Sequence, residues 1–367
     1  MKRWLCALPV FLLCLSVHGA LCETYTYGGS ARDWMNGVVV AADGRIAVTG
    51  YTLSSDGTLS DRTRTWRAGW VMMLSDDMQV LWNYCSRSGD FDHMHCPVFH
   101  EDGTLSVVHE TEGRQMKIVR LGTNGKEHSS QTVLSQPDKS TVFGVEGATR
   151  WGYLLSKISG YGQQRSYRLY NWDGGVLAAY TDWDGLHAVG GTHILCSRDK
   201  RLSLYAVDGS GGLKKLSDVC AASADGTYSR SYSGLISLPD GGAAACGAVW
   251  EGWNQGPVNR KGLISRWDAQ GNLLFEMIIE LGPLAQLVRT QEGFAATAYA
   301  QTEVGGDAQW KLLRFDEAGI LTGMEALDAP DSASDAGPLA LRGDGSVIAL
   351  MHSGSEGSED VQAMILP

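Results

Sequence analysis

The sequence of 367 residues is short of positive charge. It holds 30 Lys and Arg residues against 41 Asp and Glu residues, a formal net charge of −11 at pH 7. Nucleic acids and anionic membranes are bound through concentrated basic patches, and the few basic residues here are dispersed along the chain. Nucleic acid and anionic membrane are therefore excluded as expected partners.

The short motifs of common enzymes are also missing. There is no GxSxG nucleophile elbow, no P-loop, no HExxH zinc motif and no GxGxxG segment after a strand. Apolar residues do not recur at the three-to-four-residue spacing of amphipathic helices. The sequence thus points to no particular reaction and to an all-β chain.

Cysteines are few and scattered beyond residue 22, with no CxxC spacing and no adjacent pair. They are Cys85, Cys96, Cys196, Cys220 and Cys246. Export permits disulfides, but no obvious pair falls on neighbouring predicted strands. We expect buried thiols that pack as small apolar groups.

Residues 1–22 have the pattern of an export signal. Lys2 and Arg3 precede an apolar stretch at 4–17, and small residues follow it. The alternative, a membrane anchor, requires an apolar run of roughly 20 residues, and this stretch is shorter. We expect an exported mature chain, residues 23–367, that is secreted or held at the cell surface or in the periplasm, with no integral membrane segment.

Six segments share one pattern, in which a β-run meets an Asp- or Gly-rich turn and a second β-run leaves it. They are residues 69–84, 115–128, 166–180, 201–216, 261–277 and 309–324. Most follow an inner strand pair joined by a turn such as Asp43–Gly44 or Asp344–Gly345, where Gly tolerates the positive φ of a tight hairpin. This recurrence is typical of β-propeller blades.

The repeats predict one all-β domain over residues 23–367. It is a seven-bladed β-propeller of four-stranded antiparallel blades. The seventh unit has only three strands of its own, and residues 24–27 are expected to supply the fourth. An N-terminal strand completing the last blade would close the ring and remove an exposed sheet edge.

Strand order places the uniform Asp–Gly turns at one face and the variable loops at the other, where binding residues usually lie. Two loops are long, residues 51–67 and 250–261. We expect ligand-binding aromatic side chains at this face: Trp34, Trp66, Trp183, Trp250, Trp253 and Tyr161. The alternative for each ring is a wedge packed between blades.

Histidines and carboxylates are the other candidates near this face. His93 and His95 point the same way in a strand and suit a divalent metal, although solvated or hydrogen-bonded histidines are the alternative. A glycosidase needs two facing carboxylates, but acidic residues also cap turns. The acidic candidates are Asp33, Asp90, Asp92, Asp182, Asp184, Asp225 and Glu251.

The Asp–Gly turns, the strand VTGYT at 48–52 and the turns WDGG at 172–175 and WDAQGN at 267–272 carry a family resemblance. The chain resembles secreted bacterial β-propellers of the quinoprotein-like or Delta-60 kind. Quinoprotein dehydrogenases proper imply a pyrroloquinoline cofactor, calcium and an adjacent-cysteine disulfide. The chain has no adjacent cysteines, so the resemblance implies the architecture alone, with no expected cofactor.

The sequence favours a binding module whose partner is a carbohydrate or a cell-surface protein. One alternative is a hydrolase or lyase acting on extracellular polysaccharide through the carboxylates and a histidine-bound metal. Another is a structural repeat protein that binds no small ligand.

Overall fold

The computed structural model describes most of the chain. The described residues are 22–59, 66–86, 91–111, 115–136, 140–159, 164–198, 201–219, 228–251, 260–301, 308–327, 337–353 and 358–367. The predicted export signal therefore lies outside the described residues, except for its last position. Among these residues, no helix is long and apolar enough to span a bilayer.

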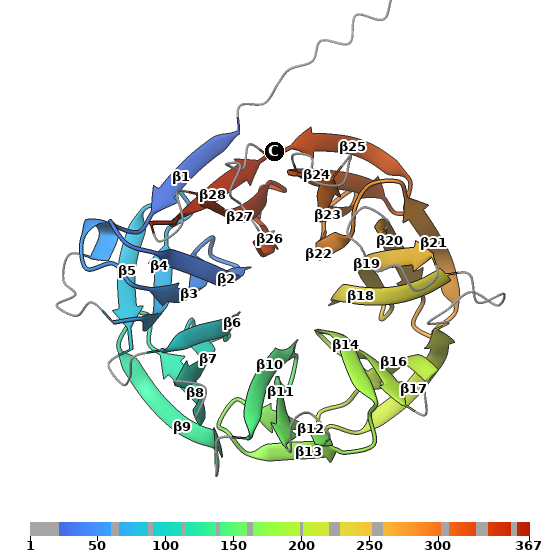
Figure 1. Cartoon of the computed structure of the whole chain (residues 1–367), viewed down its shortest axis with the longest axis horizontal. Helices are drawn as coiled ribbons and strands as arrows, with labels where there is room; N and C mark the ends of the chain where they lie inside the picture. Colours follow the sequence, from blue (N-terminus) through green and yellow to red (C-terminus); the bar gives the residue numbers. More distant parts are fainter. Residues whose placement is uncertain are drawn as a thin grey trace, which may run out of the picture.

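Seven four-stranded antiparallel sheets surround a common axis, with one edge strand of each sheet innermost (Figure 1). Blade 1 contains β2 (Asp33–Val40), β3 (Ile46–Thr52), β4 (Ala68–Leu74) and β5 (Val80–Cys85), with the short 3₁₀ helix η1 (Gly57–Leu59) after β3. Blade 2 contains β6 (His93–Phe99), β7 (Leu105–Thr111), β8 (Gln115–Leu121) and β9 (Glu127–Ser135). Blade 3 contains β10 (Val142–Thr149), β11 (Gly152–Ser159), β12 (Gln164–Asn171) and β13 (Val176–Tyr180).

The remaining blades repeat this arrangement. Blade 4 contains β14 (Gly185–Gly190), β15 (His193–Arg198), β16 (Arg201–Val207) and β17 (Leu213–Val219). Blade 5 contains β18 (Tyr228–Ser237), β19 (Ala243–Glu251), β20 (Arg260–Trp267) and β21 (Leu273–Ile279). Blade 6 contains β22 (Leu284–Arg289), β23 (Gly293–Gln301), β24 (Ala308–Asp316) and β25 (Leu321–Ala326). Blade 7 combines β26 (Leu339–Leu341), β27 (Val347–Ser353) and β28 (Asp360–Leu366) with β1 (Glu23–Tyr27). The predicted seven-bladed propeller is confirmed.

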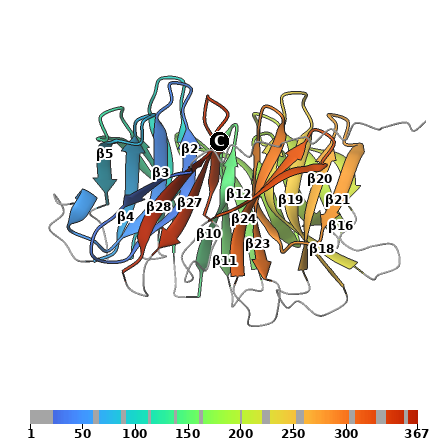
Figure 2. The ribbon, with the colours of Figure 1, turned by 90° about the horizontal axis from the view of Figure 1, so that it is seen from above.

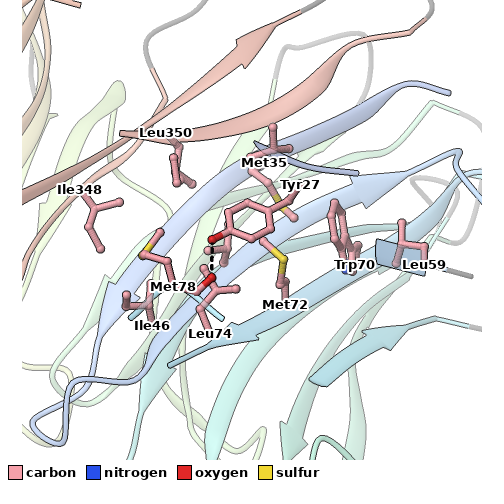
Figure 3. Packing of buried hydrophobic residues seen from close by; sticks show 13 residues of the cluster. Tyr27, Met35, Ile46, Leu59, Trp70, Met72, Leu74, Met78, Ile348 and Leu350 are labelled. Carbon is pink, nitrogen blue, oxygen red and sulfur yellow. Dashed lines mark hydrogen bonds between the residues drawn. The ribbon is translucent and has the colours of Figure 1, made fainter. Parts of the chain in front are cut away.

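The ring is closed by β1, which pairs antiparallel with β28 as the outermost strand of blade 7. Tyr27 lies between blades 7 and 1, and its hydroxyl donates a 2.7 Å hydrogen bond to the carbonyl of Met78 (Figure 3). Its ring packs in a cluster that includes Trp70 of blade 1 and Leu350 of blade 7. The predicted closure by the N-terminal strand is confirmed, and it joins the two ends of the chain through a buried contact.

Central strands are buried on both faces because each blade is covered by a neighbour on either side. All seven residues of β3 and all seven of β4 are buried. This explains why these strands read as continuous apolar runs rather than alternating ones. The outermost strands, such as β9 in blade 2, are mostly exposed and polar.

Asp–Gly turns join the two innermost strands of blades 1, 2, 5 and 7 and lie at the same end of these blades. Gly44 and Gly103 take φ values of 87° and 76°, which side chains with a Cβ rarely adopt. Figure 2 shows the blades from the side, with their connections gathered at the two ends of the strands. We call the end with these turns the turn face and the opposite end the loop face.

Six of the seven innermost strands carry an irregularity in their pairing with the second strand. The register shifts lie in β2, β6, β10, β14, β18 and β22. In β6 the shift lies between His95 and Val98, and Cys96 takes a φ of 48°. Bulges of this kind re-aim side chains, and in β2 and β6 they lie beside the residues of the candidate site.

Candidate ligand-binding site

The predicted aromatic residues differ in their exposure to solvent. Trp66 is 61% exposed, and Trp34 and Trp250 are half-buried. Trp183 is buried at 5% exposure. Trp253 and Tyr161 lie outside the described residues. The rings are therefore not equivalent, and each described one is located by its neighbours.

Trp183 is a wedge between strands rather than a surface ring. It stacks on Tyr180 with ring centroids 4.4 Å apart and contacts Tyr167 at 5.1 Å. Because the ring is enclosed by these side chains, it has no face to offer a ligand. The expectation that Trp183 binds a ligand is corrected to the alternative, a residue of the core. Trp267 and Trp310 of the outer strand pairs are likewise buried.

Trp34 lies at the junction of blades 7 and 1. It stacks on His352 of β27 with ring centroids 3.7 Å apart and an interplanar angle of 10°. The backbone N–H of Met35 donates a 3.0 Å hydrogen bond to Nε2 of His352. Arg32 lies 5.2 Å from the centre of the Trp34 ring. Burial lowers the pKa of His352 to about 4, so the ring is neutral near pH 7 and can accept this bond.

Arg67 lies between two aromatic rings at the start of blade 1's third strand. Its guanidinium carbon is 4.7 Å from the centre of the Tyr51 ring and 5.2 Å from that of Phe91. Tyr51 is buried, whereas Phe91 is 58% exposed. A parallel backbone bridge joins Arg67 to Phe91 and so fixes blade 1 against blade 2 at this point. Both ring contacts are within the range of cation–π attraction.

His93 and His95 continue this group into blade 2. His93 makes an edge contact with Tyr51 at 4.7 Å and lies parallel to His95 at 5.6 Å. Burial lowers the pKa of His93 to about 4, and the charges of Arg67 and His95 act in the same direction. His93 is therefore a neutral imidazole near pH 7.

His95 is held by hydrogen bonds at both ring nitrogens. The side-chain amide of Asn36 contacts Nδ1 at 3.0 Å, and Nε2 contacts the carboxylate of Glu110 at 3.2 Å. An amide N–H donating to Nδ1 leaves the proton on Nε2, which then donates to Glu110. Burial opposes the shift, but this bond and the neighbouring positive charges hold the pKa of Glu110 below its usual value.

These contacts do not favour the metal predicted at His93 and His95. A metal bound to His95 would displace either Asn36 or Glu110 from its ring. No group of three or more His, Cys, Asp or Glu side chains suited to a metal occurs in the part of the chain that the structure describes. Burial also raises the pKa of the neighbouring Cys96 to about 12, which keeps it a thiol.

The two most buried carboxylates among the acidic candidates hold loops in place. Asp33 accepts hydrogen bonds from the hydroxyl of Thr52, from Ser54 Oγ at 2.8 Å and from the Gly29 amide at 2.9 Å. It is fully buried, as is Asp92 at the equivalent position of blade 2.

Asp92 contacts Ser86 Oγ at 2.6 Å and Nε2 of His109 at 3.0 Å. Asp182 pairs with Arg198 at 2.6 Å, while Asp184 is exposed. Asp90, Asp225 and the side chain of Glu251 lie outside what the structure describes. Asp33, Asp92 and Asp182 thus hold turns and strands in place.

The structure thus assembles a set of aromatic, imidazole and charged side chains at the loop face of blades 7, 1 and 2. We call it the blade 7–1–2 patch, and it consists of Arg32, Trp34, Asn36, Tyr51, Trp66, Arg67, Phe91, His93, His95, Glu110 and His352. Trp34, Trp66, His93 and His95 were predicted as candidates. The others were missed, although the aromatic–Arg ends of loop 51–67 were visible in the sequence.

A similar pair closes the long loop of blade 5. Arg260 lies 5.4 Å from the centre of the Trp250 ring, and the two residues are direct partners on β20 and β19. The loop between them, with Trp253, lies outside the described residues. Trp250 therefore belongs to a separate location, two blades from blade 7, the nearest blade of the blade 7–1–2 patch.

Comparison with known proteins identifies the architecture and no functional family. No family model and no curated protein matches the chain. Among solved structures, it is similar to a streptogramin B lyase, with a TM-score of 0.56, 13% identity and coverage of 94% of this chain and 98% of that one. It is also similar to the C-terminal WD40 domain of Sif2, with a TM-score of 0.52, 10% identity and coverage of 93% and 99%.

A third similar structure is the polysaccharide lyase Uly1, with a TM-score of 0.53, 9% identity and coverage of 93% of this chain and 90% of that one. At these identities the likeness shows the fold alone. A β-propeller serves lyases and WD40 domains alike, so function has to be argued from the residues of the site.

Proposed function

We propose that the protein is an exported binding module whose blade 7–1–2 patch holds a carbohydrate. The observation that carries this proposal is the strong exposure of two aromatic residues in this region, Trp66 at 61% and Phe91 at 58%, with Phe91 next to Arg67. Sugar rings pack their C–H faces on aromatic side chains, and polar groups at the edge fix orientation. His95, Glu110 and Asn36 supply such groups next to the rings.

The test is a glycan panel measured by thermal shift and then by calorimetry on the exported protein. A ligand that binds only the native state raises its melting temperature. Trp66→Ala and Phe91→Ala should each weaken carbohydrate binding about fivefold, since a stacked ring contributes roughly 1 kcal/mol beyond its burial. Val176→Ala, a 55% exposed apolar residue on the outer strand of blade 3, is the matched control.

Unchanged binding in both aromatic variants would contradict the proposal, as would a panel in which no glycan binds. In that case a cell-surface protein becomes the better candidate partner.

A second candidate is a lyase acting on extracellular polysaccharide. One observation favours it. His93 is a neutral imidazole beside Tyr51, a combination suited to proton transfer. Elimination leaves a conjugated double bond, so ultraviolet absorbance of the glycan mixtures reads out this activity in the same experiment. Absorbance that does not rise would rule it out for the glycans tested.

A further inference from the structure

Resting on the proposed function, we propose that Arg67 is an anion anchor and that the patch takes an acidic saccharide. The ligand class is a sugar unit that carries a carboxylate on its ring. Arg67 would bind this carboxylate while the sugar ring packs on the exposed aromatic side chains beside it.

The charge of Arg67 is not neutralised within the described fold. Its guanidinium lies against Tyr51 and Phe91, and among the described residues no carboxylate forms an ion pair with it. Its Nε is buried and has no hydrogen-bond partner in the same part of the chain. A cation held in this way retains unused N–H donors.

The acidic side chain of Glu110 lies near Arg67 but is already bound elsewhere. Burial raises the pKa of Glu110, but the hydrogen bond from His95 lowers it, and Glu110 is close enough to Arg67 for that positive charge to lower it further. Its carboxylate is bound to Nε2 of His95 at 3.2 Å instead of to Arg67. The positive charge of Arg67 therefore remains for a group from outside the described fold.

The geometry of the Arg67 guanidinium also suits a carboxylate ligand. Arginine presents a rigid planar fork that matches a carboxylate with two parallel hydrogen bonds. The rings of Tyr51 and Phe91 restrict its orientation before a ligand arrives, which lowers the ordering cost of binding. Phe91 is exposed beside the guanidinium, so one ligand unit can stack on this ring and pair with Arg67 together.

The experiment compares trigalacturonate with its methyl ester by calorimetry. The two probes share their sugar rings and differ in the carboxylate charge. The wild-type protein should prefer the acid at least tenfold, and the preference should weaken as salt is raised. Arg67→Gln should remove the preference, because the affinity for the acid should fall much more than the affinity for the ester. Arg67→Lys should keep part of it, because the charge remains without the planar fork.

Arg260→Gln is the matched control, since Arg260 lies over Trp250 in the same way in blade 5. It should keep the full preference for the acid. Circular dichroism and melting curves check that every variant is folded. A preference that survives in Arg67→Gln, or that is lost equally in Arg260→Gln, would overturn the assignment to Arg67.

The outcomes also separate this inference from the proposed function. If a neutral glycan binds in a manner that depends on Trp66 while the acid has no advantage over the ester, the acidic ligand is wrong and the carbohydrate site stands. If no acidic or neutral glycan binds, both proposals fail.

Discussion

Arginines at the two faces of the propeller are held in different ways. At the turn face, Arg45 pairs with Asp43 at 2.8 Å and Arg120 pairs with Asp102 at 2.7 Å. At the loop face of blades 1 and 5, Arg67 and Arg260 lie over aromatic rings instead. Arg32 and Arg198 of the loop face do pair with carboxylates, those of Glu359 and Asp182, so the contrast with the turn face applies to Arg67 and Arg260.

Turn-face arginines also tie blades together. Arg342 of blade 7 contacts Asp76 of blade 1 at 2.9 Å, and Arg266 of blade 5 contacts Glu317 of blade 6 at 2.7 Å. Exposed ion pairs contribute little individually, but these cross the boundaries between blades. The turn face thus uses ion pairs to hold the ring, whereas Arg67 and Arg260 at the loop face form no ion pair among the described residues.

The largest expected effect concerns Asp33, a carboxylate at the loop face that holds the fold together through hydrogen bonds. Asp33→Ala removes a fully buried acceptor from Thr52, Ser54 and the Gly29 amide. Leaving these donors unsatisfied should lower the free energy of unfolding by about 3 to 4 kcal/mol. Urea titration measures the change, with Asp173→Ala, an exposed turn residue, as control. A loss no larger than that of the control would show that Asp33 is dispensable for folding.

Acid should weaken the junction of blades 7 and 1. The pKa of His352 is about 4 in the folded protein, below the ordinary value of 6.5. The unfolded chain therefore binds more protons between these values, so stability is complete above pH 6.5 and is lost as pH falls toward 4. This histidine accounts for up to about 3 kcal/mol of that loss.

The variant His352→Gln keeps a side-chain acceptor for the Met35 amide and cannot titrate in this range. Urea titrations at several pH values should show a flatter acid limb for the variant than for the wild type. Parallel acid limbs would contradict the role assigned to His352. His93→Gln is a useful second variant, because the pKa of His93 is also about 4.

The fold was predictable because its signals are local. Each Asp–Gly turn needs a positive φ at one position within a hairpin, as at Gly44. The residues that form such a turn are adjacent in the sequence, so the turn can be recognised there. Even the closure by β1 followed from counting, since blade 7 had three strands of its own. A repeated unit is thus recognised from short-range chemistry alone.

The candidate site was predictable only in part, because its contacts cross blades. The hydrogen bond from Met35 to His352 joins residues 317 positions apart, and no local pattern indicates it. Trp183 was expected at the surface, but its burial depends on how Tyr167 and Tyr180 fill the space around it. The pairing of Arg67 with Phe91 likewise depends on the way blade 2 packs against blade 1.

The smallest expected effect is the one that tests the comparison of the two faces directly. Arg266→Gln breaks contacts to Asp240 and Glu317 and should lower the free energy of unfolding by about 1 kcal/mol, with carbohydrate binding unchanged. Arg67→Gln breaks no ion pair among the described residues and should change stability by less than about 0.5 kcal/mol. Urea titration of the two variants side by side measures both values. If Arg67→Gln destabilises the protein as much as Arg266→Gln does, then Arg67 also holds the ring and the division between the faces fails, because its charge would already be in use within the fold.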